Sequence, residues 1–116
     1  MIIGYDTHFD ACHFLPNHPK CGKMHGHTWH VSVQAQGPID LATGMVCDFH
    51  KFKQLVAEVV DTFDHCSINE FVSPPTCENI AQYIYDLMEM KLLDQLPNLN
   101  LAAVTVQEGE GGYAIA

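Results

Sequence analysis

The sequence has no arginine, and this absence excludes several classes of protein. Its five basic side chains are all lysines, against fourteen acidic residues, so the formal net charge is −9. Nucleic-acid binding requires a basic surface that neutralises phosphates. Anionic membranes attract basic segments for the same reason. We therefore expect neither nucleic acid nor a membrane surface among the partners of this chain.

Long apolar segments are also lacking, and a secretory leader is not expected. No window approaches the roughly 18–20 consecutive apolar residues that a membrane-spanning helix requires. Residues 1–6, Met-Ile-Ile-Gly-Tyr-Asp, have neither the basic region nor the apolar stretch of a signal peptide. The expected location is therefore the cytoplasm.

Disulfides are not expected. The chain has five cysteines, an odd count, and no Cys-x-x-Cys pair. Together with the missing leader, this argues against a disulfide framework and favours reduced thiols that pack as small apolar side chains. Histidine, in contrast, is abundant, with eight in 116 residues. This excess favours metal or proton chemistry.

Apolar periodicity and turn residues predict a single domain over residues 1–116. Alternation predicts strands over 3–15 and 25–36, and further strands are expected over 101–108 and 113–116. Asp48 and Thr76 are expected to cap two helices, the first of which runs to about residue 62. The predicted fold class is α+β in the order ββααββ, with an antiparallel sheet and two helices on one face.

The pair His25-Gly-His27 is the first candidate site. Side chains two residues apart on a strand project from the same face, and His13 is expected on the neighbouring strand of the same hairpin. Three imidazoles without a thiolate suit Zn²⁺ with its fourth position open. The alternative is that His25 and His27 are ordinary strand residues and His13 is a hydrogen-bonded core histidine.

Cys21 is a candidate nucleophile or base. It stands four residues before His25, in a loop between Lys20 and Lys23. Nearby positive charge favours the thiolate, although most unpaired cysteines are passive buried thiols.

Three acidic or imidazole side chains further along the chain are candidates too. A carboxylate next to an imidazole can orient it for proton transfer, although Asp64-His65 could be only a polar pair in a loop. Glu108 shares strand parity with Val104 and Val106, which points it toward a sheltered site. A buried carboxylate needs a partner, either the N–H groups of a ligand or a lysine. Surface or loop roles are expected for the remaining histidines, His8, His18, His30 and His50.

Six ordered motifs run through nearly the whole chain. They are Phe9-Asp-Ala-Cys-His13, Cys21-x₃-His25-Gly-His27, Gly44-Met-Val-Cys-Asp-Phe49, Phe63-Asp-His65 with Asn69, Pro75-Thr-Cys-Glu78-Asn-Ile-Ala81 and Val106-Gln-Glu108. Together they resemble the 6-pyruvoyl-tetrahydropterin synthase/6-carboxy-tetrahydropterin synthase family. The resemblance implies the tunnelling fold, whose ββααββ subunits assemble as rings, usually a hexamer of two trimers. It also implies active sites between subunits.

The resemblance also implies roles for individual residues. The zinc ligands would be His13, His25 and His27. The catalytic triad would be Cys21, Asp64 and His65. Substrate contacts would come from Glu108, which would anchor the pterin, and from Thr76, Cys77 and Glu78, which would line its pocket.

The implied substrate is 7,8-dihydroneopterin triphosphate. Three residues between Cys21 and His25 resemble the members that release acetaldehyde and triphosphate, leaving 6-carboxy-tetrahydropterin for queuosine and other deazapurines. Animal pyruvoyl-forming members typically have five. A pyruvoyl-forming synthase, a dihydroneopterin aldolase and a non-enzymatic zinc or pterin-binding module remain as alternatives. Lys20 and Lys23 are the first choice for phosphate contact, and the lack of arginine leaves a dephosphorylated pterin open.

Overall fold

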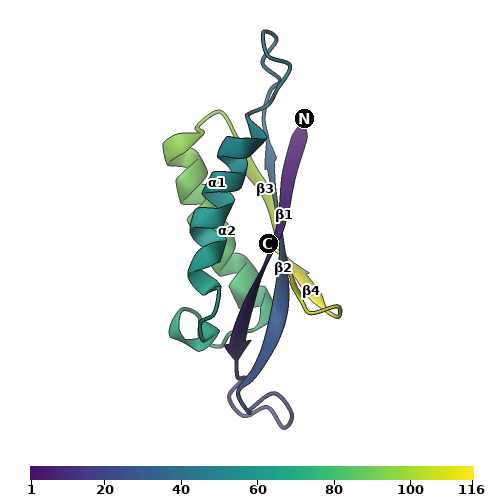
Figure 1. The fold of residues 1–116 in the computed structure, drawn as a ribbon, viewed down its shortest axis with the longest axis vertical. Coiled ribbons are helices and arrows are strands. Elements are labelled where there is room, and N and C mark those ends of the chain that lie inside the picture. Colours follow the sequence, from purple (N-terminus) through teal and green to yellow (C-terminus); the bar gives the residue numbers. More distant parts are fainter.

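The computed structural model describes residues 1–116, and its sheet is antiparallel with two helices on one face (Figure 1). The strands are β1 (Ile2–His13), β2 (His25–Gln36), β3 (Asn100–Glu108) and β4 (Tyr113–Ile115). The helices are α1 (Phe49–Val60) and α2 (Cys77–Gln95). The strands lie in the order β1-β2-β3-β4, and both helices lie between β2 and β3 in sequence. The predicted fold class and element order are confirmed.

Two elements were predicted to be longer than they are. β1 ends at His13 rather than at residue 15, because the Leu15 N–H turns away to the Cys21 carbonyl oxygen at 2.8 Å. α1 ends at Val60, and Asp61–Phe63 continue as a 3₁₀ turn. Neither helix has the length and apolar character needed to cross a bilayer.

The two predicted helix caps are present. The Asp48 carboxylate accepts a hydrogen bond from the His50 N–H at 2.8 Å, and the Thr76 hydroxyl oxygen accepts one from the Asn79 N–H at 3.2 Å. Each bond satisfies an amide that has no partner within its helix. Glu78 lies in the first turn of α2, where its charge complements the helix dipole.

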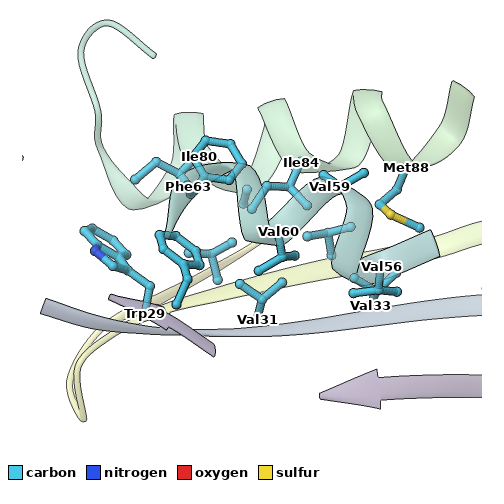
Figure 2. Packing of buried hydrophobic residues seen from close by; sticks show 14 of the residues in the cluster. Trp29, Val31, Val33, Val56, Val59, Val60, Phe63, Ile80, Ile84 and Met88 are labelled. Carbon is cyan, nitrogen blue, oxygen red and sulfur yellow. The ribbon is translucent and has the colours of Figure 1, made fainter. Parts of the chain in front are cut away.

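The core lies between the sheet and the helices. Alternate residues of β2, among them Trp29, Val31 and Val33, are fully buried against α1 and α2 (Figure 2). Full burial of one such aliphatic or aromatic side chain contributes roughly 1.5–3 kcal/mol. Trp29 lies at one end of this core, two residues after His27. The core therefore fixes the strand face from which the histidines project.

Candidate functional site

The β1–β2 hairpin brings the three predicted metal ligands together. His13 pairs with His25 across the ladder, and His27 follows two residues later on the same face. The candidate ligand nitrogens of these residues lie within 4.8 Å of one another. The Nε2 atoms of His13 and His27 are buried and have no hydrogen-bond partner. Because an unpaired buried polar atom costs free energy, these nitrogens fit a metal ion.

Backbone carbonyls fix the tautomers of two of these imidazoles. His13 Nδ1 lies 2.9 Å from the Pro75 carbonyl oxygen, and His25 Nδ1 lies 2.7 Å from that of Lys23. An Nδ1–H that donates to a carbonyl leaves the Nε2 lone pair available to a metal. Burial lowers the pKa of His13, outweighing the Pro75 hydrogen bond and the Glu108 charge, which raise it. A neutral imidazole is the form that binds metal.

Trp29 packs against the three histidines. Its ring lies edge-on to His13 at 4.9 Å and to His27 at 5.5 Å between centroids. The Trp29 Nε1–H donates to the Ala11 carbonyl oxygen at 3.3 Å. This single tryptophan therefore stiffens the cluster and gives it an intrinsic fluorescent reporter.

A hollow of about 360 Å³ lies beside the histidines. Its lining residues are Lys20, Cys21, Lys23, His25, His27 and Glu108. The Glu108 carboxylate lies 3.3 Å from His27 Nε2 and 3.7 Å from His13 Nε2, in contacts that are not hydrogen bonds. The structure thus brings the predicted thiol, the predicted pterin anchor and both predicted phosphate contacts to two of the predicted metal ligands.

The other three lysines have different partners. Lys51 Nζ donates to Gln95 at 2.9 Å, and Lys91 Nζ lies 2.6 Å from a Glu58 carboxylate oxygen. Lys53 lies over the Tyr5 ring at 5.9 Å from its centroid. Lys20 and Lys23 are therefore the lysines that the chain places at this hollow.

The segment Thr76–Glu78 begins α2 next to the end of β3. The Cys77 thiol donates to the Val106 carbonyl oxygen at 3.0 Å. Burial raises the pKa of this thiol, which favours its protonated form. Pro75, directly before the segment, contacts His13, which connects the predicted pterin wall to the three histidines.

Asp64 and His65 form a hydrogen-bonded pair. Asp64 Oδ2 lies 2.8 Å from His65 Nδ1, and Oδ1 accepts from the Asp10 N–H at 2.9 Å. The Asp10 bond, followed by the His65 bond, lowers the pKa of the Asp64 carboxyl. His65 has a left-handed φ of 59° and donates its N–H to the Asp10 carbonyl oxygen at 2.7 Å. The pair thus holds an ionised carboxylate against an oriented imidazole.

This pair and Cys21 do not line the same hollow. His65 belongs to a second hollow of about 550 Å³ that includes Asp10, Cys12 and Thr28 but not Cys21. Only His27 lines both hollows. The His65 side chain is 81% exposed. Within one chain, the predicted catalytic residues are therefore divided between two surfaces.

The model of the 6-pyruvoyl tetrahydropterin synthase family matches residues 2–116. The chain belongs to this family. A protein of Archaeoglobus fulgidus, provisionally named 6-carboxy-5,6,7,8-tetrahydropterin synthase, is 43% identical over 98% of this chain and 93% of its own length. The 6-carboxy-5,6,7,8-tetrahydropterin synthase of Bacillus subtilis is 31% identical over 97% of this chain and 82% of its own length.

Two further family resemblances bear on the choice of reaction. A protein of Pyrococcus furiosus named dihydroneopterin monophosphate aldolase is 36% identical over 78% of this chain and 76% of its own length. The solved structure of the Caenorhabditis elegans 6-pyruvoyl tetrahydropterin synthase superposes with a TM-score of 0.87 at 25% identity, covering 100% of this chain and 94% of that one. The tunnelling fold is thereby confirmed, and this family member is a pterin synthase in the broad sense.

Sequence reasoning missed several contacts that shape this family member's site. The carbonyl of Pro75 and the ring of Trp29 contact the predicted metal ligand His13, and Asn69 binds the backbone next to it. His18 binds the loop that carries Cys21. Asn69 belongs to a motif but had no assigned role, whereas backbone carbonyls leave no signal in a sequence.

Proposed function

We propose that this chain is a zinc-dependent 6-carboxy-5,6,7,8-tetrahydropterin synthase. It would convert 7,8-dihydroneopterin triphosphate and one water molecule to 6-carboxy-tetrahydropterin, acetaldehyde and triphosphate, and would serve queuosine or other deazapurine biosynthesis in the cytoplasm. The observation that carries the proposal is the hollow that joins Cys21 and Glu108 to the histidine cluster. The names of the A. fulgidus and B. subtilis relatives support the carboxy-forming reaction.

The metal would be held by His13, His25 and His27. Their nitrogens lie close together, and two of them are buried without a partner. When bound, zinc supplies Lewis-acid polarisation of the hydroxyls on the pterin side chain. Pro75 and Lys23 hold the rings of His13 and His25 in the tautomer that a metal requires.

Glu108 would anchor the pterin ring. Its side chain is 33% exposed at the mouth of the hollow, and its carboxylate accepts hydrogen bonds only. The adjacent N–H groups of a pterin offer two parallel donors, which a carboxylate binds in a bidentate manner. Thr76, Cys77 and Glu78, at the start of α2, would complete the pterin pocket.

Two groups would move protons. Cys21 would act as the base that removes a proton from the pterin side chain, because it lines the hollow beside the metal ligands. His65 would be the second proton-transfer group, since Asp64 fixes its Nδ1 and leaves Nε2 free. Because one group acts on the pterin side chain and the other acts near the ring, protons can move from the side chain to the ring without an external reductant.

The active site would be completed by a second copy of the chain. His65 is 81% exposed and lies in a different hollow from Cys21. For both to reach one substrate, the His65 surface of one subunit would have to pack over the Cys21 hollow of its neighbour. β1 and β4 are the two edges of the sheet, and unpaired edges readily add strands from a neighbour. We therefore propose a homo-oligomer, by family resemblance a hexamer built as a dimer of trimers.

Lys20 and Lys23 would bind the triphosphate. They line the hollow, whereas the other three lysines contact Gln95, Tyr5 and Glu58. Lysine binds phosphate as a point charge. The net charge of −9 disfavours nucleic acid and anionic membranes as partners, so the proposed partner is a small dihydropterin.

An aldolase acting on a dihydroneopterin is the second candidate. The P. furiosus relative carries this name, and the lack of arginine suits a substrate with fewer phosphates. A pyruvoyl-forming synthase is the third, supported by the name of the C. elegans structure. Neither reaction releases acetaldehyde with a 6-carboxy product. Product identification therefore separates all three.

The base assignment is tested by Cys21→Ala. We expect this variant to lose turnover of dihydroneopterin triphosphate while it keeps about one zinc ion per subunit, because Cys21 is not a ligand in a three-histidine site. Cys47→Ala is the matched control, since Cys47 lies outside the hollow. Full activity in Cys21→Ala would rule out the thiol as the base.

A further inference from the structure

We propose that His18 is a positioning residue that holds the loop of the catalytic thiol. The inference rests on the proposed role of Cys21. The loop joins β1 to β2 at one end of the molecule and carries Lys20, Cys21 and Lys23 (Figure 1). The sequence alone gives His18 only a surface or loop role, because nothing in its spacing relates it to the other histidines.

The His18 side chain binds the backbone of the residues that line the hollow. Its Nδ1 accepts hydrogen bonds from the Cys21 N–H at 2.9 Å and from the Lys20 N–H at 3.3 Å. These are the side-chain hydrogen bonds that reach the backbone of residues 15–22. One imidazole nitrogen therefore fixes the amides of the proposed base and of a proposed phosphate contact.

The His18 backbone closes the same turn. Its carbonyl oxygen accepts from the Gly22 N–H at 3.0 Å, and its N–H donates to the Leu15 carbonyl oxygen at 3.2 Å. A Cβ at Gly22 would lie 2.5 Å from the His18 oxygen, so only glycine allows this approach. Asn17, directly before, has a left-handed φ of 64°. Residues 15–22 thus form a tight turn around His18.

The turn is also connected to the three histidines of the proposed metal site. The Leu15 N–H donates to the Cys21 carbonyl oxygen at 2.8 Å, and the Lys23 carbonyl oxygen contacts His25 Nδ1 at 2.7 Å. Cys21 is therefore held on its amide by His18 and on its carbonyl by Leu15. If a substitution removed the His18 imidazole, the N–H groups of Lys20 and Cys21 would bond to water instead. The Cys21 thiol would then no longer be held in place near His25.

The chemistry of the contact predicts which substitutions preserve it. Asparagine carries a side-chain oxygen that commonly accepts from backbone N–H groups two or three residues later. Lys20 and Cys21 stand at these distances from position 18. His18→Asn should therefore retain the turn, whereas His18→Leu fills similar space without an acceptor. His50→Leu is the matched control, because His50 is an exposed histidine outside both hollows.

The test uses the full-length protein loaded with zinc. Turnover of dihydroneopterin triphosphate gives kcat and KM, and alkylation by iodoacetamide, followed by peptide mass spectrometry, gives the reaction rate of Cys21 separately from the other thiols. For His18→Leu we expect kcat to fall about 10–100-fold, the loss that misplacement of a reacting group by about 1 Å produces. Cys21 should be alkylated faster, while zinc content and melting temperature stay close to those of His50→Leu. His18→Asn should recover most of kcat and the original alkylation rate.

Three results would overturn the role of His18. The first is a His18→Leu variant with the kcat and alkylation rate of the control. The second is a His18→Asn variant as impaired as His18→Leu. The third is a parallel loss of zinc and melting temperature, which would show a general structural role. If the unmodified protein turned over no dihydropterin, the proposed function would fail, but the alkylation rates would still decide whether His18 holds Cys21.

Discussion

The side-chain amide of Asn69 binds both backbone groups of Phe14. The Phe14 N–H donates to Asn69 Oδ1 and Asn69 Nδ2 donates to the Phe14 carbonyl oxygen, each at 3.0 Å. Phe14 directly follows His13, a proposed metal ligand. Asn69 ends a segment that starts with Asp64 and whose Cys66 carbonyl accepts from the Cys12 N–H at 3.1 Å. This relationship joins the segment of the proposed proton-transfer pair to the residue that follows a proposed metal ligand.

We predict that Asn69→Leu weakens both folding and zinc binding. Loss of two partly buried hydrogen bonds should lower the free energy of unfolding of the zinc-free protein by about 1–3 kcal/mol. Loosening the backbone beside His13 should raise the zinc dissociation constant about 10-fold or more, as loss of supporting contacts does in other metal sites. Urea unfolding and a zinc titration followed by Trp29 fluorescence measure the two effects.

Gln82→Leu is the control for this prediction, because Gln82 donates to Asp86 on an exposed part of α2. An Asn69→Leu variant that lost stability but bound zinc as tightly as this control would show that the Asn69–Phe14 pair has no effect on the ligand.

His13→Ala should abolish stable zinc binding. His13 is the most buried of the three ligands, and its removal leaves two imidazoles, fewer than the three protein ligands of catalytic zinc sites. Elemental analysis after dialysis should give about one zinc per subunit for the unmodified protein and for the exposed control His8→Ala, but little for His13→Ala. Equal zinc contents in the two variants would place the metal elsewhere.

Glu108→Gln tests the pterin anchor. Replacing a charged acceptor by an amide should weaken dihydropterin binding about 10–100-fold, since hydrogen bonds to charged groups contribute about 1.5–3 kcal/mol. Zinc content should not change, because the three proposed ligands are histidines and Glu108 only lies near them. Calorimetric titration with a dihydropterin measures the effect, and Glu110→Gln is the exposed control. Unchanged affinity in Glu108→Gln would exclude the anchor.

The pH dependence of stability should contain a contribution from Asp64. Its pKa is lowered from an ordinary 3.8, first by the Asp10 N–H and then by His65. Because the native state favours the ionised form, this stabilisation is complete above the unfolded-state value near 3.8 and is lost as the pH falls through the lower native value. Asp64→Asn should therefore be less stable than the unmodified protein at pH 6, with the difference shrinking below pH 3.8.

Urea unfolding across this pH range measures that difference. A gap between Asp64→Asn and the unmodified protein that stayed constant down to pH 2 would show that the charge of Asp64 makes no contribution.

Local patterns in the sequence were enough to predict the fold and the grouping of the three histidines. Alternation placed His13, His25 and His27 on one sheet face, and the hairpin register then made them neighbours. Asp48 and Thr76 were found because an N-cap is determined by adjacent residues. The end of β1 was placed two residues too late, because the turn around His18 is held by contacts that hydropathy does not encode.

The remaining contacts depend on tertiary structure. Pro75 reaches His13 through a backbone carbonyl sixty-two residues away in sequence, and every residue type has such a carbonyl. The separation of Cys21 from Asp64 and His65 could not be predicted either, since strand parity says nothing about which hollow a loop lines.

Identification of the product is the most direct test of the proposed reaction. Zinc-loaded protein should be incubated with 7,8-dihydroneopterin triphosphate, with Cys21→Ala in parallel, and the products identified by mass spectrometry. We predict 6-carboxy-tetrahydropterin together with acetaldehyde and triphosphate from the unmodified protein, and none of them from Cys21→Ala. A 6-pyruvoyl product, or cleavage of the side chain without a 6-carboxy product, would contradict this prediction.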